Sequence, residues 1–150
     1  MSSKRVRQLL SSKGNKAQAV YSVAPTDTVY HALETMAEHN VGALVVLENG
    51  KLAGVVSERD YARKVILKGL ASRDVQVAEL MTREVITVTP HDTIATCMKH
   101  MNERKIRHLP VLENEQVVGV VSINDVVATI MKDQAFEIEQ LQGYISGTVG

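Results

Sequence analysis

The amino-acid sequence predicts an α/β protein of two βαββα units that pack sheet to sheet about an approximate two-fold axis. Three observations lead to this prediction: an internal repeat, the same order of helix and strand patterns in both copies, and a chain length of 150 residues. That length suits either one compact domain or two very small subdomains that share a core. Short additional helices are expected at both ends of the chain.

The internal repeat aligns residues 23–62 with residues 88–127 at a shift of 65 positions, and the alignment needs no gap. The copies are identical at 16 of 40 positions, whereas unrelated sequences of average composition would match at roughly 1 position in 17. Both copies contain the string Gly-Val-Val-Ser-x-x-Asp, at residues 54–60 and 119–125. The two copies are therefore expected to share one local structure.

Each copy is expected to contain a strand, a helix, a hairpin of two strands and a second helix. Apolar residues recur at helical spacing after the turn at 25–28, in which Thr26 or Asp27 is the expected helix cap. The runs ALVVL and LAGVVS flank a Glu-Asn-Gly-Lys turn that is typical of a hairpin. The predicted helices lie at 29–39, 57–67, 93–103 and 122–132, and the predicted hairpin strands at 43–47, 52–57, 109–112 and 117–122.

Outside the repeats, short helices are predicted at residues 6–10 and 134–142. The chain divides into a basic N-terminal segment or helix at 1–19, the first repeat at 20–68, a linker with the start of the second repeat at 69–84, the second repeat at 85–132, and a C-terminal helix and tail at 133–150.

The composition indicates a folded protein and argues against two kinds of partner. Apolar residues make up 45% of the chain, and no apolar run approaches the roughly 18–20 residues needed to cross a bilayer. The net charge is zero and there are five aromatic residues. A large basic field or a base-stacking platform for nucleic acid is therefore not expected. Neither a membrane nor a nucleic acid is an expected partner.

The N-terminal segment contains five basic residues and no acidic residue before Asp27. It is expected to be a solvated helix, with the remnant of an organelle-targeting segment as the alternative, and it lacks the apolar centre of a secretory signal. The single cysteine, Cys97, excludes an internal disulfide and fits a reducing compartment. We therefore expect a cytoplasmic location, with the matrix of an organelle as the alternative.

The motifs Ser57-x-x-Asp60 and Ser122-x-x-Asp125 each follow a predicted strand directly and open a predicted helix. The structural interpretation is a capping box, in which the serine hydroxyl accepts from a backbone amide and the acid reaches back to the cap residue. The functional interpretation is a nucleotide site, because a helix start can bind phosphate and a carboxylate can accept from two ribose hydroxyls. The motif alone leaves both interpretations open.

The paired strings GVVSERD and GVVSIND, with IRHLPV at 106–111, resemble a tandem pair of CBS (cystathionine-β-synthase-like) domains, the Bateman module, over about residues 20–132. The string SERDYARKVILKG is similar to small stand-alone CBS-pair proteins of bacteria and plant organelles. The resemblance implies that an adenine nucleotide binds in the cleft between the copies and that two pairs form a homodimer. AMP is the first choice of nucleotide, and ATP, ADP and NAD remain open.

The resemblance also implies roles for individual residues. The matched residues are Asp60 and Asp125 for the ribose, Ser57, Ser122, Arg107 and His108 for the phosphate, and Val23, Gly42, Ala43 and Ile86 for the adenine.

The two copies differ where a phosphate would need cations. A shift of 65 residues places Arg107 and His108 on Gly42 and Ala43, so the two nucleotide sites are expected to be inequivalent. Arg59 is either a further cation near the first site, or a solvated helix residue or ion-pair partner. Two basic side chains in the pair favour a monophosphate or a diphosphate over a triphosphate.

Neither catalysis nor metal binding is expected. Cys97 and His100 share a predicted helix, but no third ligand has a recognisable spacing, and no nucleophile–base pair or Gly-rich phosphate loop is present. Cys97 is expected to be a small buried hydrophobe. The other uncommitted residues are expected on helix surfaces (His31, His39, His100), in a turn (His91) or in the core (Met36, Met98, Met101).

The expected function is a regulatory or signal-transduction module that senses energy or redox state through an adenine nucleotide. It would act through an unidentified protein partner or through its own oligomer. The alternatives are an NAD(H)-binding regulator of a redox partner and a nucleotide-independent interaction scaffold. An apolar stripe in the last predicted repeat helix is either a dimer contact or ordinary core, and consists of Val126, Val127, Ile130 and Met131.

Overall fold

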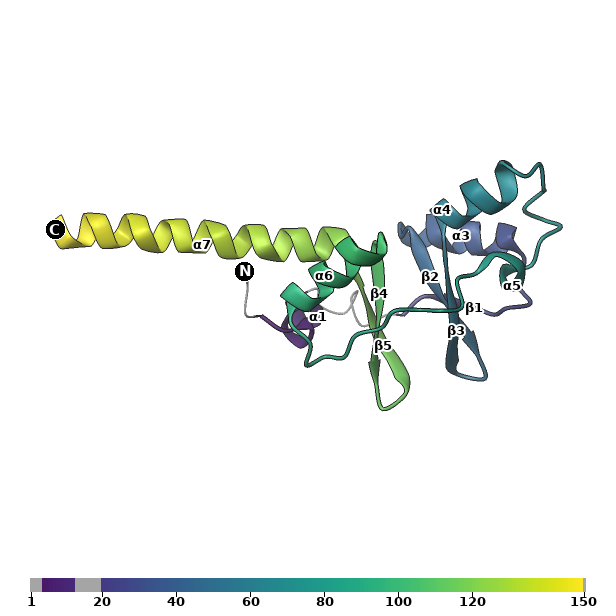
Figure 1. Ribbon diagram of the computed structural model, residues 1–150, viewed down its shortest axis with the longest axis horizontal. Helices are drawn as coiled ribbons and strands as arrows, with labels where there is room; N and C mark the ends of the chain where they lie inside the picture. The colour runs from purple at the N-terminus through teal and green to yellow at the C-terminus, as the bar shows by residue number, and fades with distance from the viewer. Residues whose placement is uncertain (1–3, 13–19, 150) are drawn as a thin grey trace.

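The structure, a computed structural model, describes residues 4–12 and 20–149. Two β-hairpins stand side by side at its centre, and helices lie on the outer side of each hairpin (Figure 1). One helix extends far beyond the rest of the molecule and carries the C-terminus (Figure 1). The predicted α/β fold of two packed repeats is confirmed.

The first repeat forms a three-stranded sheet in which β1 runs parallel to β2, and β2 pairs with β3 in antiparallel orientation. Its elements are β1 (Ser22–Val23), α3 (Val29–His39), β2 (Ala43–Glu48), β3 (Lys51–Ser57), α4 (Glu58–Tyr61) and the π-helical turn η1 (Ala62–Ile66). The linker that follows contains the helix α5 (Val77–Leu80). The predicted order of strand, helix, hairpin and helix is confirmed here.

The second repeat contains a hairpin whose register repeats that of β2 and β3 position by position. Its elements are α6 (Ile94–Arg104), β4 (His108–Glu113), β5 (Gln116–Ser122) and α7 (Ile123–Val149). The strand expected ahead of α6 is reduced to a single parallel bridge between Val88 and Val111. Two backbone hydrogen bonds still hold Val88 to the hairpin, at 3.0 and 2.8 Å.

Threonine hydroxyls begin the first long helix of each repeat. Thr28 caps α3 by accepting from a first-turn amide at 3.1 Å, and Thr93 caps α6 in the same way. The expected cap at Thr26 or Asp27 is wrong. The Asp27 carboxylate instead accepts from the Ala24 amide at 2.8 Å, which closes the turn ahead of the helix.

The two hairpins use the same two-residue turn with different residues. Both central residues have positive φ in each turn: 53° at Asn49 and 78° at Gly50, and 52° at Asn114 and 66° at Glu115. This combination matches the type I′ turn, which favours Asn-Gly. Glu115 therefore occupies a left-handed backbone conformation that strongly favours glycine.

The last helix, α7, runs without a break over 27 residues. The prediction of separate helices at 122–132 and 134–142 is therefore wrong. The residues at the predicted junction, Lys-Asp-Gln at 132–134, include neither proline nor glycine, so the backbone chemistry does not stop the helix there. Although α7 is long, neither it nor another helix in the described part of the chain is apolar enough to span a membrane.

Each repeat has its own hydrophobic core, and each core is completed by a short helix from outside the repeat. The linker helix α5 packs into the first core, and α1 (Val6–Ser12) packs into the second. Equivalent backbone hydrogen bonds anchor them: the Val77 amide donates to Asp27 and the Val6 amide to Asp92, both at 2.8 Å. The N-terminal helix thus supports the repeat that lies farther away in the sequence.

The expectation of a solvated N-terminal helix holds for only one face of α1. Val6, Leu9 and Leu10 are at most 8% exposed, because they fill the second core. A glycine of the hairpin makes room for this contact, since a Cβ at Gly119 would lie 2.8 Å from a Leu10 methyl group.

Candidate functional site

A cleft of about 780 Å³ lies between the two repeats, and we call it the inter-repeat cleft. Three chain segments form most of its walls: the β3–α4–η1 junction at 57–64, the segment at 82–86 and the α6–β4 junction at 104–108. The first belongs to the first repeat and the last to the second. A molecule in the cleft would therefore contact both repeats at once.

The motif of the first repeat forms a complete capping box at the edge of this cleft. The Asp60 amide donates to Ser57 Oγ at 3.1 Å, and the Ser57 amide donates to Asp60 Oδ2 at 3.0 Å. The Ser57 hydroxyl also donates to Oδ2, at 3.0 Å. The structural interpretation of the motif is thus realised, but it occupies only one of the two carboxylate oxygens.

The other carboxylate oxygen of Asp60 pairs with a lysine that sequence analysis missed. Lys64 Nζ lies 3.4 Å from Asp60 Oδ1 and donates to the Leu80 carbonyl at 2.9 Å. Lys64 and Asp60 are four residues apart in a helical segment, which places their side chains next to each other. The four-residue spacing between Asp60 and Lys64 could have indicated this ion pair from the sequence.

The second repeat contributes Arg107 and His108 to the cleft. A Cβ at Gly42 would lie 3.7 Å from His108 Cε1, so these residues of opposite repeats are neighbours. Arg59 reaches across in the other direction, because its Nη1 donates to the Lys105 carbonyl at 3.4 Å. Arg59 therefore lines the cleft as a cation and also links the two repeats.

Four predicted site residues do not line the inter-repeat cleft. Ser122 and Asp125 form the second capping box, with amide-to-side-chain distances of 3.0 and 3.2 Å. Val23 is 4% exposed and belongs to the first core, and Ala43 begins β2. The predicted residues that the structure does bring together in the cleft are Gly42, Ser57, Arg59, Asp60, Ile86, Arg107 and His108.

Cys97 lies in the second core and is fully buried. Burial, with a smaller contribution from the charge of Asp92, raises the pKa of the Cys97 thiol to about 11. The thiol is therefore protonated and unreactive near neutral pH, as expected for a core residue. Among the residues that the structure describes, no group of three or more His, Cys, Asp or Glu side chains could hold a metal ion.

The three methionines expected in the core pack there. Met36 and Met101 are 2% and 4% exposed, and Met98 packs against the second core. The apolar stripe of α7 divides instead: Val126 is fully buried, whereas Val127 is 39% exposed.

These features define a tandem-repeat α/β module with a binding cleft between its repeats. A profile of the CBS domain matches residues 17–67 and 77–132. The chain belongs to the CBS-domain family, and the predicted tandem CBS pair is confirmed.

The chain is similar to CBS-domain proteins over most of its length. It is 40% identical over 148 residues to the mitochondrial CBS domain-containing protein CBSX3 of Arabidopsis thaliana, which is 95% of this chain and 72% of the relative. It is 32% identical over 127 residues to YhcV of Bacillus subtilis (strain 168), covering 83% of this chain and 89% of the relative.

A solved structure from Burkholderia ambifaria MC40-6, described as a signal-transduction protein with CBS domains, has a TM-score of 0.84 and 41% sequence identity to this chain. The match covers 87% of this chain and 96% of that one. These names describe CBS-domain and signal-transduction proteins rather than enzymes, and they place the chain in a family of CBS-pair regulatory modules.

Proposed function

We propose that this protein binds an adenine nucleotide in the inter-repeat cleft and transmits the binding to a partner protein or to its own oligomer. One observation carries the proposal: Ser57 and Asp60 of the first repeat line the same cleft as Arg107 and His108 of the second. A carboxylate suits vicinal ribose hydroxyls, and cations suit a phosphate.

The cleft residues suggest how the nucleotide would lie. Its ribose would donate to Asp60 Oδ1, the carboxylate oxygen that is not part of the capping box. This oxygen pairs with Lys64 in the structure, and the ribose hydroxyl would replace that lysine. The phosphate would lie between the Ser57 hydroxyl and Arg107. Gly42 and Ile86 offer backbone and apolar contacts to the adenine ring.

Regulation would follow from the position of the cleft between the repeats. A ligand that contacts both repeats binds best in the arrangement that closes the cleft, so it shifts the protein toward that arrangement. The protein would thereby sense energy state if the nucleotide is AMP, ADP or ATP, and redox state if it is NAD(H). AMP is the first nucleotide to test, and a cytoplasmic or organellar-matrix location fits both options.

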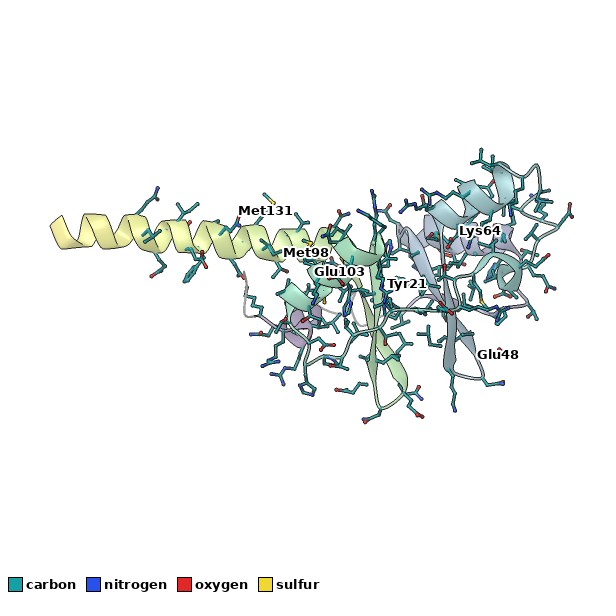
Figure 2. The ribbon with its side chains drawn as sticks, viewed as in Figure 1. Tyr21, Glu48, Lys64, Met98, Glu103 and Met131 are labelled. Carbon is teal, nitrogen blue, oxygen red and sulfur yellow. The ribbon has the colours of Figure 1, made fainter. Side chains whose placement is uncertain are left out.

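We also propose that two copies associate through α7. Exposed apolar side chains follow one side of this helix, since Val127, Met131, Ile138 and Leu141 are 39–64% exposed. They recur at intervals of three, four or seven residues, which suits packing against an identical helix. Figure 2 shows Met131 on α7, pointing away from the rest of the molecule. Sedimentation should show a dimer that Met131→Glu weakens, and a monomeric wild type would contradict the proposal.

A second candidate function is an interaction scaffold that binds no nucleotide. Both Ser-x-x-Asp motifs complete capping boxes through their own backbone amides, and caps contribute about 1 kcal/mol each without any ligand. This observation favours a purely structural role for the motifs.

Thermal melting with AMP, ATP and NADH in parallel separates the two functions. A nucleotide at about 100 times its dissociation constant adds roughly 2.7 kcal/mol of stability, which raises the melting temperature of a chain of this size by on the order of 5–10 °C. An unchanged melting temperature with all three at millimolar concentration would reject nucleotide binding and leave the scaffold.

A further inference from the structure

The inter-repeat cleft holds a large excess of positive charge in a chain whose net charge is zero. Three acidic residues line it: Glu58, Asp60 and Glu84. The six Lys and Arg side chains that line it are Arg59, Arg63, Lys64, Arg104, Lys105 and Arg107. Three positive charges are thus left over, before any contribution from His108.

Most of these cations have no acidic partner among the residues whose side chains the structure describes. Within residues 4–12 and 20–143, Lys64 is paired with Asp60, whereas Arg63, Arg104, Lys105 and Arg107 form no ion pair. Like charges that face one cleft without counterions repel one another. A bound polyanion would relieve this repulsion.

The excess belongs to this cleft and not to the CBS repeat as such. Under the shift of 65 residues, each of the six cations aligns with a residue that carries neither a lysine nor an arginine side chain. The aligned residues are Asn124, Ala128, Thr129, His39, Asn40 and Gly42. The common fold therefore does not require these charges, and their concentration in the inter-repeat cleft requires a separate explanation.

The cations are also divided between the two walls. Arg63 and Lys64 come from the first repeat, and Arg104 and Lys105 come from the second. A single phosphate placed beside Arg107 can contact only part of this set, whereas a polyphosphate chain extends across the cleft. The cleft volume of about 780 Å³ lies within the range of roughly 300–1,000 Å³ that small-molecule sites occupy.

We infer that the inter-repeat cleft selects adenine nucleotides with a polyphosphate chain over AMP, and that Lys64, Arg104 and Lys105 provide the selection. The inference rests on the proposed nucleotide function and names the ligand class of that site. A phosphate monoester carries about 1.5–2 negative charges at neutral pH, and each further phosphate adds about one. A di- or triphosphate therefore matches the excess of three charges better than a monophosphate does.

Lys64 would change partners when the nucleotide binds. In the structure its ammonium group lies on Asp60 Oδ1 and the Leu80 carbonyl. A ribose hydroxyl that donates to Oδ1 takes over the first of these contacts. The ammonium group is then released toward the phosphate chain, while its hydrogen bond to the Leu80 carbonyl keeps it near the cleft.

Calorimetric titration of the full chain with adenosine, AMP, ADP and ATP, in buffer without magnesium, tests the inference. We expect ATP and ADP to bind at least tenfold more tightly than AMP, and the difference to shrink as salt is raised. Inorganic triphosphate should compete with ATP. Equal affinities for AMP and ATP, or tighter binding of AMP, would overturn the inference and leave the proposed function intact. Failure of every adenine nucleotide to bind would reject the proposed function itself.

The double variant Arg104→Gln/Lys105→Asn tests the residue assignment. Lys105 has a left-handed backbone with φ of 56°, and asparagine is tolerated there because Asn40 holds the same position in the first repeat. We expect the ratio of ATP to AMP affinity to fall by about tenfold. The matched control Lys51→Gln/Lys132→Gln removes the same charge from exposed positions outside the cleft. An unchanged ratio in the first variant, or an equal fall in both, would refute the assignment.

Discussion

The two repeats have nearly the same backbone and different surfaces. Their hairpins share one register from the first pair to the last, and their long helices begin at equivalent threonines. After the hairpin they diverge: the first repeat continues into α4 and a π-helical turn, and the second into the 27-residue helix α7. The comparison shows that the two repeats share their hairpin and core positions, while the segments that follow the hairpin differ in structure and in the residues they expose.

The positions that line the inter-repeat cleft show the same divergence. Ile86 and Arg104 line it, and the aligned residues of the other copy are Tyr21 and His39. These two rings stack with centroids 3.7 Å apart. His39 is therefore half-buried, and not a simple helix-surface residue as expected from the sequence. The second copy has an isoleucine and an arginine where the first has a stacked aromatic pair.

The largest expected effect concerns the glycines in the second strand of each hairpin. A Cβ at Gly54 would lie 2.7 Å from the Thr82 backbone oxygen, whereas one at Gly119 would meet the Leu10 side chain at 2.8 Å. Backbone cannot move aside as easily as a leucine side chain. We expect Gly54→Ala to cost about 3 kcal/mol of unfolding free energy and Gly119→Ala about 1 kcal/mol. Urea denaturation measures both, and equal losses would contradict the argument.

The next effect concerns the two carboxylates. Asp60→Ala should weaken nucleotide binding in the inter-repeat cleft by roughly 10–150-fold, about 1.5–3 kcal/mol, because it removes the acceptor for the ribose. The second, inequivalent site that the sequence predicts at Ser122 and Asp125 lies outside this cleft. Asp125→Ala should therefore weaken binding at that site and leave binding in the inter-repeat cleft unchanged, which a two-site titration would resolve. A titration that fits two sites of equal affinity would contradict the predicted inequivalence of the two sites.

A control separates this binding effect from loss of a helix cap. Glu79→Ala removes a carboxylate that accepts from the Gln76 amide at 2.7 Å in the box that begins α5, outside the cleft. It should lower stability by about 1 kcal/mol and leave nucleotide affinity unchanged. If neither aspartate variant binds more weakly than this control, the ribose role is refuted.

The third prediction concerns Cys97, which aligns with Ala32 of the first repeat. Burial raises the pKa of the folded thiol from 9.0 to about 11, so the folded state holds this proton more tightly than the unfolded state. Its contribution is complete below pH 9 and is lost as the pH rises toward 11. Over that range the wild type should lose about 2 kcal/mol more than Cys97→Ala. Parallel denaturation curves at both pH values check this, and identical losses would contradict it.

The smallest expected effect concerns the hairpin turns. Glu115 has a φ of 66° where the first repeat has Gly50. Glu115→Gly should therefore stabilise the protein by about 0.5–1 kcal/mol. Removal of the left-handed strain at this position outweighs the extra chain entropy that glycine loses on folding. Gly50→Glu is the reciprocal control and should destabilise it. A loss of stability in Glu115→Gly would show that this turn is not strained.

Much of the fold and part of the site could be predicted from residue patterns. The helix at 29–39 and the first hairpin were accessible because apolar spacing and the Asn-Gly turn act locally. The second hairpin, whose turn is Asn-Glu, was accessible because it repeats the first. The motif at Ser57 and Asp60 was accessible because it is short and contiguous, and the pair at Arg107 and His108 was accessible through the resemblance to the CBS family. Arg104 and Lys105, immediately ahead of that pair, could have been suspected, but nothing local indicates that they face the first repeat.

The sequence alone was enough to establish two copies of one unit, since sixteen shared residues preserve the spacing of core, turn and cap. The resemblance of the strings GVVSERD, GVVSIND and IRHLPV then indicated the CBS family. Tertiary packing decided the rest. It placed α1 on the second repeat and α5 on the first, because the apolar side chains of these helices complete the two hydrophobic cores. In each case the helix packs on the repeat that is farther from it along the chain. It also brought six cations into one cleft, which no linear pattern records, because they come from segments that meet only when the repeats pack.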